Sequence, residues 1–189
     1  MAGNPKESYA TKTSDEKQWL LTASQLISCA KLIGEKSDSE WTRAIEEIPS
    51  RTRKKEVLSP GNYQRVHMML AAFALENLFK YQLVRNNRQS IYYEAAQYFK
   101  LPKVLRSHDL VELAKQSAFQ FNDNDAKLLK RLFVSSKWIG RYPTPTNSTD
   151  YKQYESELYC SSDDTSEITN LIKKVIRYID PDSSLGLQI

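Results

Sequence analysis

The stretch that decides the fold covers residues 63–85 and has the sequence YQRVHMMLAAFALENLFKYQLVR. Its apolar residues recur with the period of a helix and fall on nearly every side of it. They form two stripes joined by Leu78, namely Val66, Leu70, Phe73, Tyr81 and Val84, and Met68, Ala72, Leu75, Phe79 and Leu83. A surface helix has one apolar face, whereas a helix that is apolar all round lies inside a bundle. We therefore predict the central helix of an all-α fold, ending near Asn86 or Asn87.

One charged pair interrupts this apolar surface. Glu76 and Lys80 lie four residues apart, which is one helical turn. A carboxylate on an apolar stripe costs free energy unless it is paired. Lys80 is the local candidate partner and Arg141 the distant one. Two interpretations of Glu76 stay open: a structural ion pair, or a catalytic acid.

Helical periodicity on both sides predicts further helices around the central one. The first lies between the N-cap candidate Ser14 and Gly34, and a short second helix ends at Ile48. Downstream we expect a short helix over 91–99, one that starts at 107–109, one from the Asn122 turn to Gly140, and an amphipathic last helix over 165–180. In the helix that ends at Gly140, the expected outward residues are Lys127, Lys130, Arg131 and Lys137. The whole is one helical-bundle domain over 14–180, with a disordered N-terminus (1–13), a polar loop (144–164) and a tail (181–189).

The composition is that of an ordinary soluble globular protein, with 189 residues, 40% apolar and 26% charged. The net charge of +4 permits contact with nucleic acid without arguing strongly for it. Cys29 and Cys160 are far apart and have no partner at metal-ligand spacing, so we expect no metal and no cofactor. The absence of a long apolar run predicts a cytoplasmic protein without membrane contact. The basic run RTRKK at 51–55 is either a solvated loop or a phosphate contact.

Three segments, AAFALENLFKYQLV, SHDLVELAK and WIGRYPTP, resemble in this order the motifs of the HEPN family, the higher-eukaryote and prokaryote nucleotide-binding domain. The resemblance covers residues 62–145. It implies an antiparallel four- or five-helix bundle that is usually a homodimer. It also implies RNA cleavage, nucleotide or RNA binding, or partnership with a minimal nucleotidyltransferase, often in toxin–antitoxin or phage-defence systems.

The sequence departs from this family at one motif. RNase members carry an arginine four to six residues before a histidine, and neither His67 nor His108 has one. Lys103 is the only basic residue in either window, and Arg106 is too close to His108. We therefore predict a HEPN-like nucleotide- or RNA-binding protein without the standard RNase motif. The alternatives are a variant metal-independent endoribonuclease, in which a dimer assembles His108, Arg141 and Lys103 or Arg106, and a non-catalytic interaction module.

These arguments select a small set of candidate residues. His108 can exchange a proton near neutral pH, and Arg141 can grip a phosphate with two donors. They are the candidate catalytic residues, and the candidate binding residues are Glu76, Lys80, Lys103, Arg106, Asp109 and Tyr142. The structural alternatives are that His108 and Asp109 cap and pack a helix start, and that Arg141 forms a salt bridge to Glu76 or Asp109. His67 is expected to be a packing or interface residue.

Overall fold

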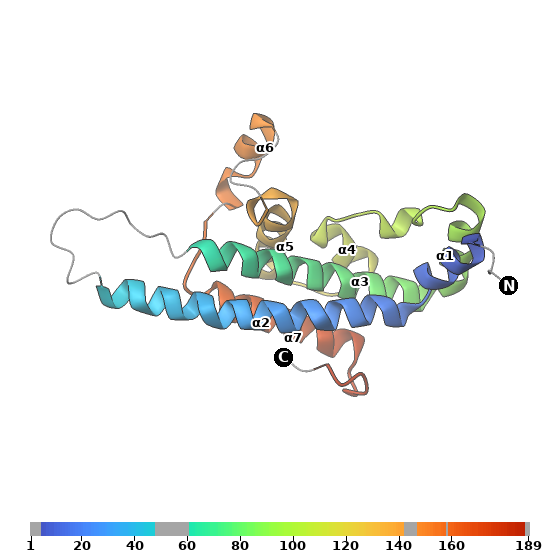
Figure 1. Cartoon of the computed structure of the whole chain (residues 1–189), viewed down its shortest axis with the longest axis horizontal. Coiled ribbons are helices and arrows are strands. Elements are labelled where there is room, and N and C mark those ends of the chain that lie inside the picture. The colour runs from blue at the N-terminus through green and yellow to red at the C-terminus, as the bar shows by residue number, and fades with distance from the viewer. Residues whose placement is uncertain (1–4, 48–60, 142–146, 158, 188–189) are drawn as a thin grey trace.

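The computed structural model of the chain describes residues 5–47, 61–141, 147–157 and 159–187. Within these ranges the chain is helical and contains no strand, which confirms the predicted all-α class. The α-helices are α1 (Pro5–Thr13), α2 (Glu16–Glu47), α3 (Gly61–Tyr98), α4 (Leu110–Gln116), α5 (Asp123–Val134), α6 (Ser148–Gln153) and α7 (Asp164–Ile179) (Figure 1). Single turns of 3₁₀-helix lie at Lys103–Leu105 and Glu155–Glu157, and a π-helical turn at Ser135–Ile139 follows α5.

The long helices α2 and α3 run antiparallel along each other and form the axis of the molecule (Figure 1). The predicted central helix is the first part of α3, and its interior residues Ala71, Ala74, Leu75 and Leu78 are completely buried. The helix bends at Asn87, where φ is −129° and ψ is 25°, and then continues to Tyr98. The expected stop at this position is therefore a kink.

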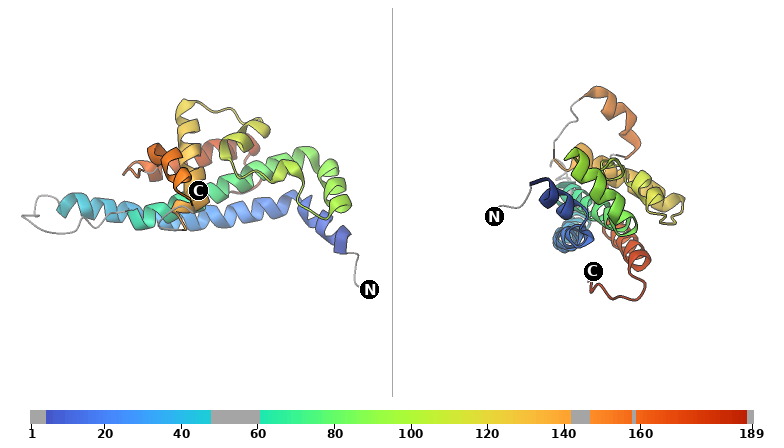
Figure 2. Two further views of the ribbon diagram at one scale, coloured as in Figure 1. Left: turned by 90° about the horizontal axis from the view of Figure 1, so that it is seen from above. Right: turned by 90° about the vertical axis from the view of Figure 1, so that its right-hand side faces the viewer.

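The remaining helices cover two sides of α3. The apolar stripe of α7 is buried on one side, as its periodicity predicts, through Ile168, Leu171, Ile172, Val175 and Ile179. On another side α5 crosses α3. The two views show this, since α5 is seen end-on in Figure 1 and side-on in the left view of Figure 2. The predicted turn at Asn122 is a capping box, in which Asn122 and Asp125 bond each other's backbone N–H groups.

The expected disorder of the N-terminus is wrong for residues 5–13, which form α1. This helix packs against the C-terminal end of α3 (Figure 1). Its Ala10 is completely buried, and the rings of Tyr9 and Phe99 lie 5.1 Å apart in an edge-to-face arrangement. The indole N–H of Trp19 also donates to the Thr13 carbonyl at 3.1 Å. These contacts order a segment whose own composition is polar.

Two further boundaries differ from expectation. The helix break at Gly34 does not occur, because α2 runs through it without interruption to Glu47. A Cβ atom at Gly34 would lie 2.9 Å from Cε1 of His67, so the glycine permits close approach of two helices and does not end one. The expected polar loop over 144–164 contains α6 and the 3₁₀ turn Glu155–Glu157. The basic run at 51–55 lies outside the described residues.

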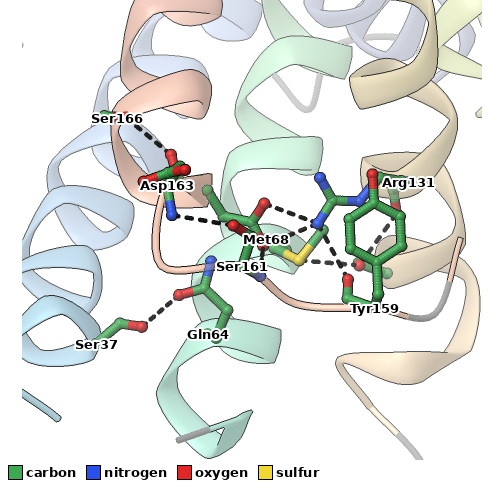
Figure 3. Close-up of polar contacts among 10 residues, drawn as sticks. Ser37, Gln64, Met68, Arg131, Tyr159, Ser161, Asp163 and Ser166 are labelled. Atoms are coloured by element: carbon green, nitrogen blue, oxygen red, sulfur yellow. Dashed lines mark hydrogen bonds and ion pairs between the residues drawn. The ribbon is translucent and has the colours of Figure 1, made fainter. Parts of the chain in front are cut away.

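Arg131 was expected to point outward but is buried, with 4% of its surface exposed. Its Nη2 donates to both carboxylate oxygens of Asp164 at 2.7 and 2.8 Å. The same Nη2 donates to the Tyr159 carbonyl at 3.0 Å (Figure 3). The ring of Tyr159 covers the guanidinium, with 3.9 Å between ring centroid and Cζ. Burial is tolerated here because the charge is paired with a completely buried carboxylate. This pair ties α5 to the start of α7.

Candidate functional site

One face of α3 carries the candidate site. Phe73, Glu76 and Lys80 follow one another at spacings of three and four residues, which brings their side chains into one line on a helix. The connection between α3 and α4 supplies His108, and the segment after α5 supplies Arg141. That segment passes close to α3 at Gly140, where a Cβ atom would lie 2.5 Å from Cβ of Met69. The glycine therefore permits the approach that brings Arg141 onto this face.

The carboxylate of Glu76 is the centre of the site. Its Oε1 accepts a hydrogen bond from Lys80 Nζ at 2.6 Å. His108 Nδ1 lies 3.0 Å from Oε1 and 3.1 Å from Oε2. The exposed fraction of the side chain is 10% for Glu76 and 3% for Lys80, but 68% for His108. The site is thus a buried ion pair that holds a solvent-exposed histidine.

This arrangement sets the orientation of the His108 ring. An ionised carboxylate can only accept hydrogen bonds, so Nδ1 of His108 carries the proton that is donated to Glu76. The second ring nitrogen, Nε2, then has a free lone pair in a mostly exposed side chain. A ligand outside the protein can donate to this atom, or lose a proton to it.

The ammonium group of Lys80 has two partners in the structure, and the sequence predicted only one of them. Besides the ion pair with Glu76, its Nζ lies 5.7 Å from the ring centroid of Trp19 on α2. Carboxylate and indole together compensate a cation that is almost fully buried. Lys80 therefore acts by pairing with Glu76, and direct contact with a ligand is not available to it. Nothing in the sequence around Trp19 links it to Lys80, so only the tertiary structure shows this contact.

Arg141 is exposed and lies over the ring of Phe73, with 4.9 Å between Cζ and the ring centroid. The proposed salt bridges from Arg141 to Glu76 or Asp109 are not formed, and across the described residues Arg141 makes no ion pair. Its guanidinium donors are therefore open to a ligand. Sequence reasoning missed Phe73 as a site residue, although its position three residues before Glu76 was a usable signal.

The other candidates divide between structural and exposed positions. Asp109 is the N-cap of α4, and its Oδ1 accepts from the backbone N–H groups of Val111 and Glu112 at 2.9 and 3.1 Å, which is the capping alternative. Arg106 is exposed, and its Nε donates to the Leu101 carbonyl at 2.6 Å. Lys103 is also exposed on the same connection. Tyr142 lies outside the described residues.

Neither a metal-binding group nor a membrane-spanning helix is found among the described residues. Among the residues that the structure describes, no group of histidine, cysteine and acidic side chains is placed to hold a metal ion. In the same part of the chain, no helix has the length and apolar character needed to span a membrane. No family model, curated protein or solved structure matches this chain. The geometry of the site is therefore the basis for assigning a function.

Proposed function

We propose that the chain is a HEPN-like antiparallel helical bundle that binds a phosphate-bearing ligand, RNA or a nucleotide, without the standard RNase motif. His108 and Arg141 would contact the ligand, and Glu76 with Lys80 would position His108. The observation that carries the proposal is the position of His108. Its Nδ1 is fixed by the buried Glu76 carboxylate, while 68% of the side chain is exposed and Nε2 is free. A histidine anchored in this way has a polar atom oriented for a ligand.

The charges at the site support a phosphate ligand. Glu76 and Lys80 compensate each other as a buried pair, so the net charge available at the surface comes from Arg141 and from His108 when it is protonated. A guanidinium has planar paired donors that match two phosphate oxygens. Lys103 and Arg106 add exposed positive charge on the segment that leads to His108. Phosphate contacts of this kind supply most of the affinity for nucleic acid and are sensitive to salt.

The interaction-module alternative predicts that Glu76, His108 and Arg141 close into one buried network. His108 and Arg141 are instead exposed, and Arg141 lies on Phe73. Residues whose only role is to connect helix ends would be expected to have their hydrogen-bond donors paired within the protein. This arrangement favours a ligand-binding site.

The proposal is tested by titrating a labelled single-stranded RNA and, separately, ATP against the full chain at low salt. A charged contact contributes about 1.5–3 kcal/mol and a neutral hydrogen bond about 0.5–1.5 kcal/mol, so Arg141→Ala should weaken binding about tenfold or more and His108→Ala about twofold or more. The control is Arg177→Ala, which removes an exposed arginine from α7 and should change the affinity less than about twofold. Absence of binding by the wild-type protein to both ligands would rule the proposal out. Binding of only one identifies the ligand.

A second candidate function is a variant metal-independent endoribonuclease, favoured by the Glu76–His108 contact. A carboxylate-held imidazole with a free Nε2 can take the proton of a ribose 2′-hydroxyl, and Arg141 could stabilise the charge on the phosphorane. Incubation of tRNA and mRNA with the protein in the presence of a chelator is the direct assay. Cleavage that disappears in His108→Gln supports the enzyme, and intact RNA in the presence of a binding-competent protein contradicts it.

The family resemblance extends the proposal to assembly. We propose that two copies of the chain form a homodimer with His108 and Arg141 along a groove between them, and that a minimal nucleotidyltransferase is the partner in a toxin–antitoxin or phage-defence system. Light scattering after size-exclusion chromatography gives the oligomeric state. A monomer at the concentrations where RNA or ATP binds would contradict the dimer and leave the ligand proposal standing.

A further inference from the structure

A cavity of about 250 Å³ lies between α2 and α7, with α3 as its floor. Its walls are mainly apolar and include Ile27 and Ala30 from α2 and Ile168 and Ile172 from α7. The charged residues of the cavity lining are Lys31, Glu35 and Lys173, and of these Lys31 and Glu35 are exposed. His67 is the residue that α3 contributes. Glu76 is nine residues further along α3, so this cavity lies on the opposite face of the helix from the His108 site.

His67, which lines this cavity, has one hydrogen-bonding atom without a partner. The residue is buried, with 2% of its surface exposed, and Nδ1 lies 2.8 Å from the Ala30 carbonyl oxygen. A carbonyl can only accept, so Nδ1 carries the proton and donates it. Burial lowers the pKa of His67, which keeps the ring neutral. Nε2 is consequently an acceptor, and it is buried without a partner.

Thr165, another residue of the lining, also carries an unpaired polar atom. The hydroxyl oxygen of Thr165 on α7 is buried and has no hydrogen-bond partner. A Cβ atom at Gly34 would lie 3.0 Å from the methyl group of Thr165 and 2.9 Å from the ring of His67, which is too close for a larger residue without a shift of these groups. The glycine thus brings α2, His67 and Thr165 together. Leaving buried polar atoms unpaired costs free energy, and natural proteins rarely do so without a reason.

We propose that this cavity binds a small, mainly apolar molecule that carries one hydroxyl or N–H group. The ligand would donate to Nε2 of His67 and share a hydrogen bond with the Thr165 hydroxyl. Its apolar body would lie against Ile27, Ile168 and Ile172. The His108 site takes no part, and the inference stands whether or not the chain binds RNA or a nucleotide.

Size and lining argue for an organic ligand over water alone. A water molecule takes about 30 Å³ of liquid volume and needs two to four polar partners. A water bound to Nε2 of His67 or to the Thr165 hydroxyl would fill only a small part of the 250 Å³, and most of the cavity surface is apolar and offers water no partner. An apolar body with one donor satisfies both parts of the lining, as in most small-molecule pockets.

The test compares phenol with toluene, two molecules of nearly the same shape, of which only phenol has a donor. The full chain is titrated with each probe while the ring ¹⁵N and ¹H resonances of His67 are followed by NMR. We expect saturable binding of phenol with a shift of the Nε2 resonance. Toluene should bind at least about fivefold more weakly, because it cannot form the hydrogen bond.

A matched pair of variants assigns the binding to this cavity. Thr165→Val and Thr169→Val make the same chemical change within one lining, but only Thr165 has the buried unpaired hydroxyl. Thr165→Val should reduce the preference for phenol over toluene about threefold or more, and Thr169→Val should leave it unchanged. Thr169→Phe, which fills the space, should abolish binding of both probes. Melting temperatures confirm that each variant is folded.

Four results would overturn the proposal. The first is the absence of saturable shifts with phenol. The second is equal affinity for phenol and toluene. The third is an unchanged phenol preference in Thr165→Val together with retained binding in Thr169→Phe, which would place the probe elsewhere. A bridging water on Nε2 that phenol does not displace also counts against it, since the two buried atoms would then be satisfied by solvent.

Discussion

The carboxylate of Glu76 joins two side chains in opposite environments. Lys80 is buried and pairs with it at 2.6 Å, whereas His108 is exposed and contacts it at 3.0 Å. The contact with Lys80 stabilises the fold, because a buried ammonium without a counter-charge is strongly unfavourable. The contact with His108 orients the imidazole ring, because it decides which ring nitrogen faces outward. One residue therefore serves both the core and the candidate site.

Separating these two roles gives a first prediction. Glu76→Gln leaves Lys80 buried without an anion, so the free energy of unfolding should fall by about 3 kcal/mol or more. The double variant Glu76→Met, Lys80→Met replaces both charges by apolar chains of similar length, and should recover to within about 1 kcal/mol of wild type. Urea denaturation measures all three proteins. Glu46→Gln, at an exposed position on α2, is the control and should change stability by less than about 0.5 kcal/mol. A double variant as unstable as Glu76→Gln would contradict this account.

His67 gives a prediction for pH. Burial lowers the folded-state pKa of His67 below its ordinary value of 6.5, against weaker raising effects of the Ala30 carbonyl, Asp38 and Asp164. Below pH 6.5 the unfolded chain then binds the proton that the folded chain resists. The stability from neutral His67 is present above that pH and is lost as pH falls through the lowered pKa, at a slope of at most about 1.4 kcal/mol per pH unit.

The measurement is the free energy of unfolding between pH 5 and 7.5 for wild type and His67→Gln. The variant should lack the decline that wild type shows below pH 6.5. The other charged residues of the cavity lining are lysines and a glutamate, residue types that ordinarily titrate outside this range. His108→Gln is the comparison at the only other histidine in the chain. Equal slopes in wild type and His67→Gln would show that His67 is not the group responsible.

At the level of elements, two ion pairs join α5 and α7: the buried pair of Arg131 and Asp164, and the more exposed pair of Lys174 and Asp125 at 2.8 Å. Arg131 and Asp164 are 4% and 0% exposed, and the carboxylate also accepts from the backbone N–H of Ser161 at 2.9 Å (Figure 3). The segment 159–161, which leads into α7, is therefore held by the same two side chains. We infer that this pair decides where α7 begins relative to α5.

Arg131→Met should lower the free energy of unfolding by about 3–5 kcal/mol, because it leaves Asp164 charged and buried. The matched control is Lys130→Met, one residue earlier on the exposed side of α5, with an expected change below about 0.5 kcal/mol. Denaturation followed by circular dichroism gives both values. Similar losses in the two variants would mean that charge alone, and not the buried pair, determines the effect.

At the scale of the whole molecule, α1 covers one end of the antiparallel pair α2–α3 (Figures 1 and 2). Removal of residues 1–13 takes away the buried Ala10, the Tyr9–Phe99 ring pair and the hydrogen bond from Trp19 to Thr13. The ring pair and the hydrogen bond contribute about 1 kcal/mol each, so we expect a loss of about 2 kcal/mol. Thermal denaturation of the shortened chain measures it. An unchanged melting temperature would indicate that α1 adds no stability.

The fold was predictable to the extent that it depends on local periodicity. The central helix, the last amphipathic helix and the start of α5 follow from apolar spacing and from capping residues such as Asn122. Three features were not predictable in this way. Gly34 continues a helix, Arg131 points inward and α1 is ordered, because each depends on a partner far along the chain.

The candidate site divides in the same manner. The sequence by itself determined the all-α class and placed Lys80 within reach of Glu76, since residues four apart on a helix are neighbours wherever the helix packs. Only the tertiary structure decided that His108 meets Glu76 while Arg141 lies on Phe73. The physical reason is the path of two connections: one carries His108 over the carboxylate, and the other passes close to Met69 at Gly140 and brings Arg141 to Phe73.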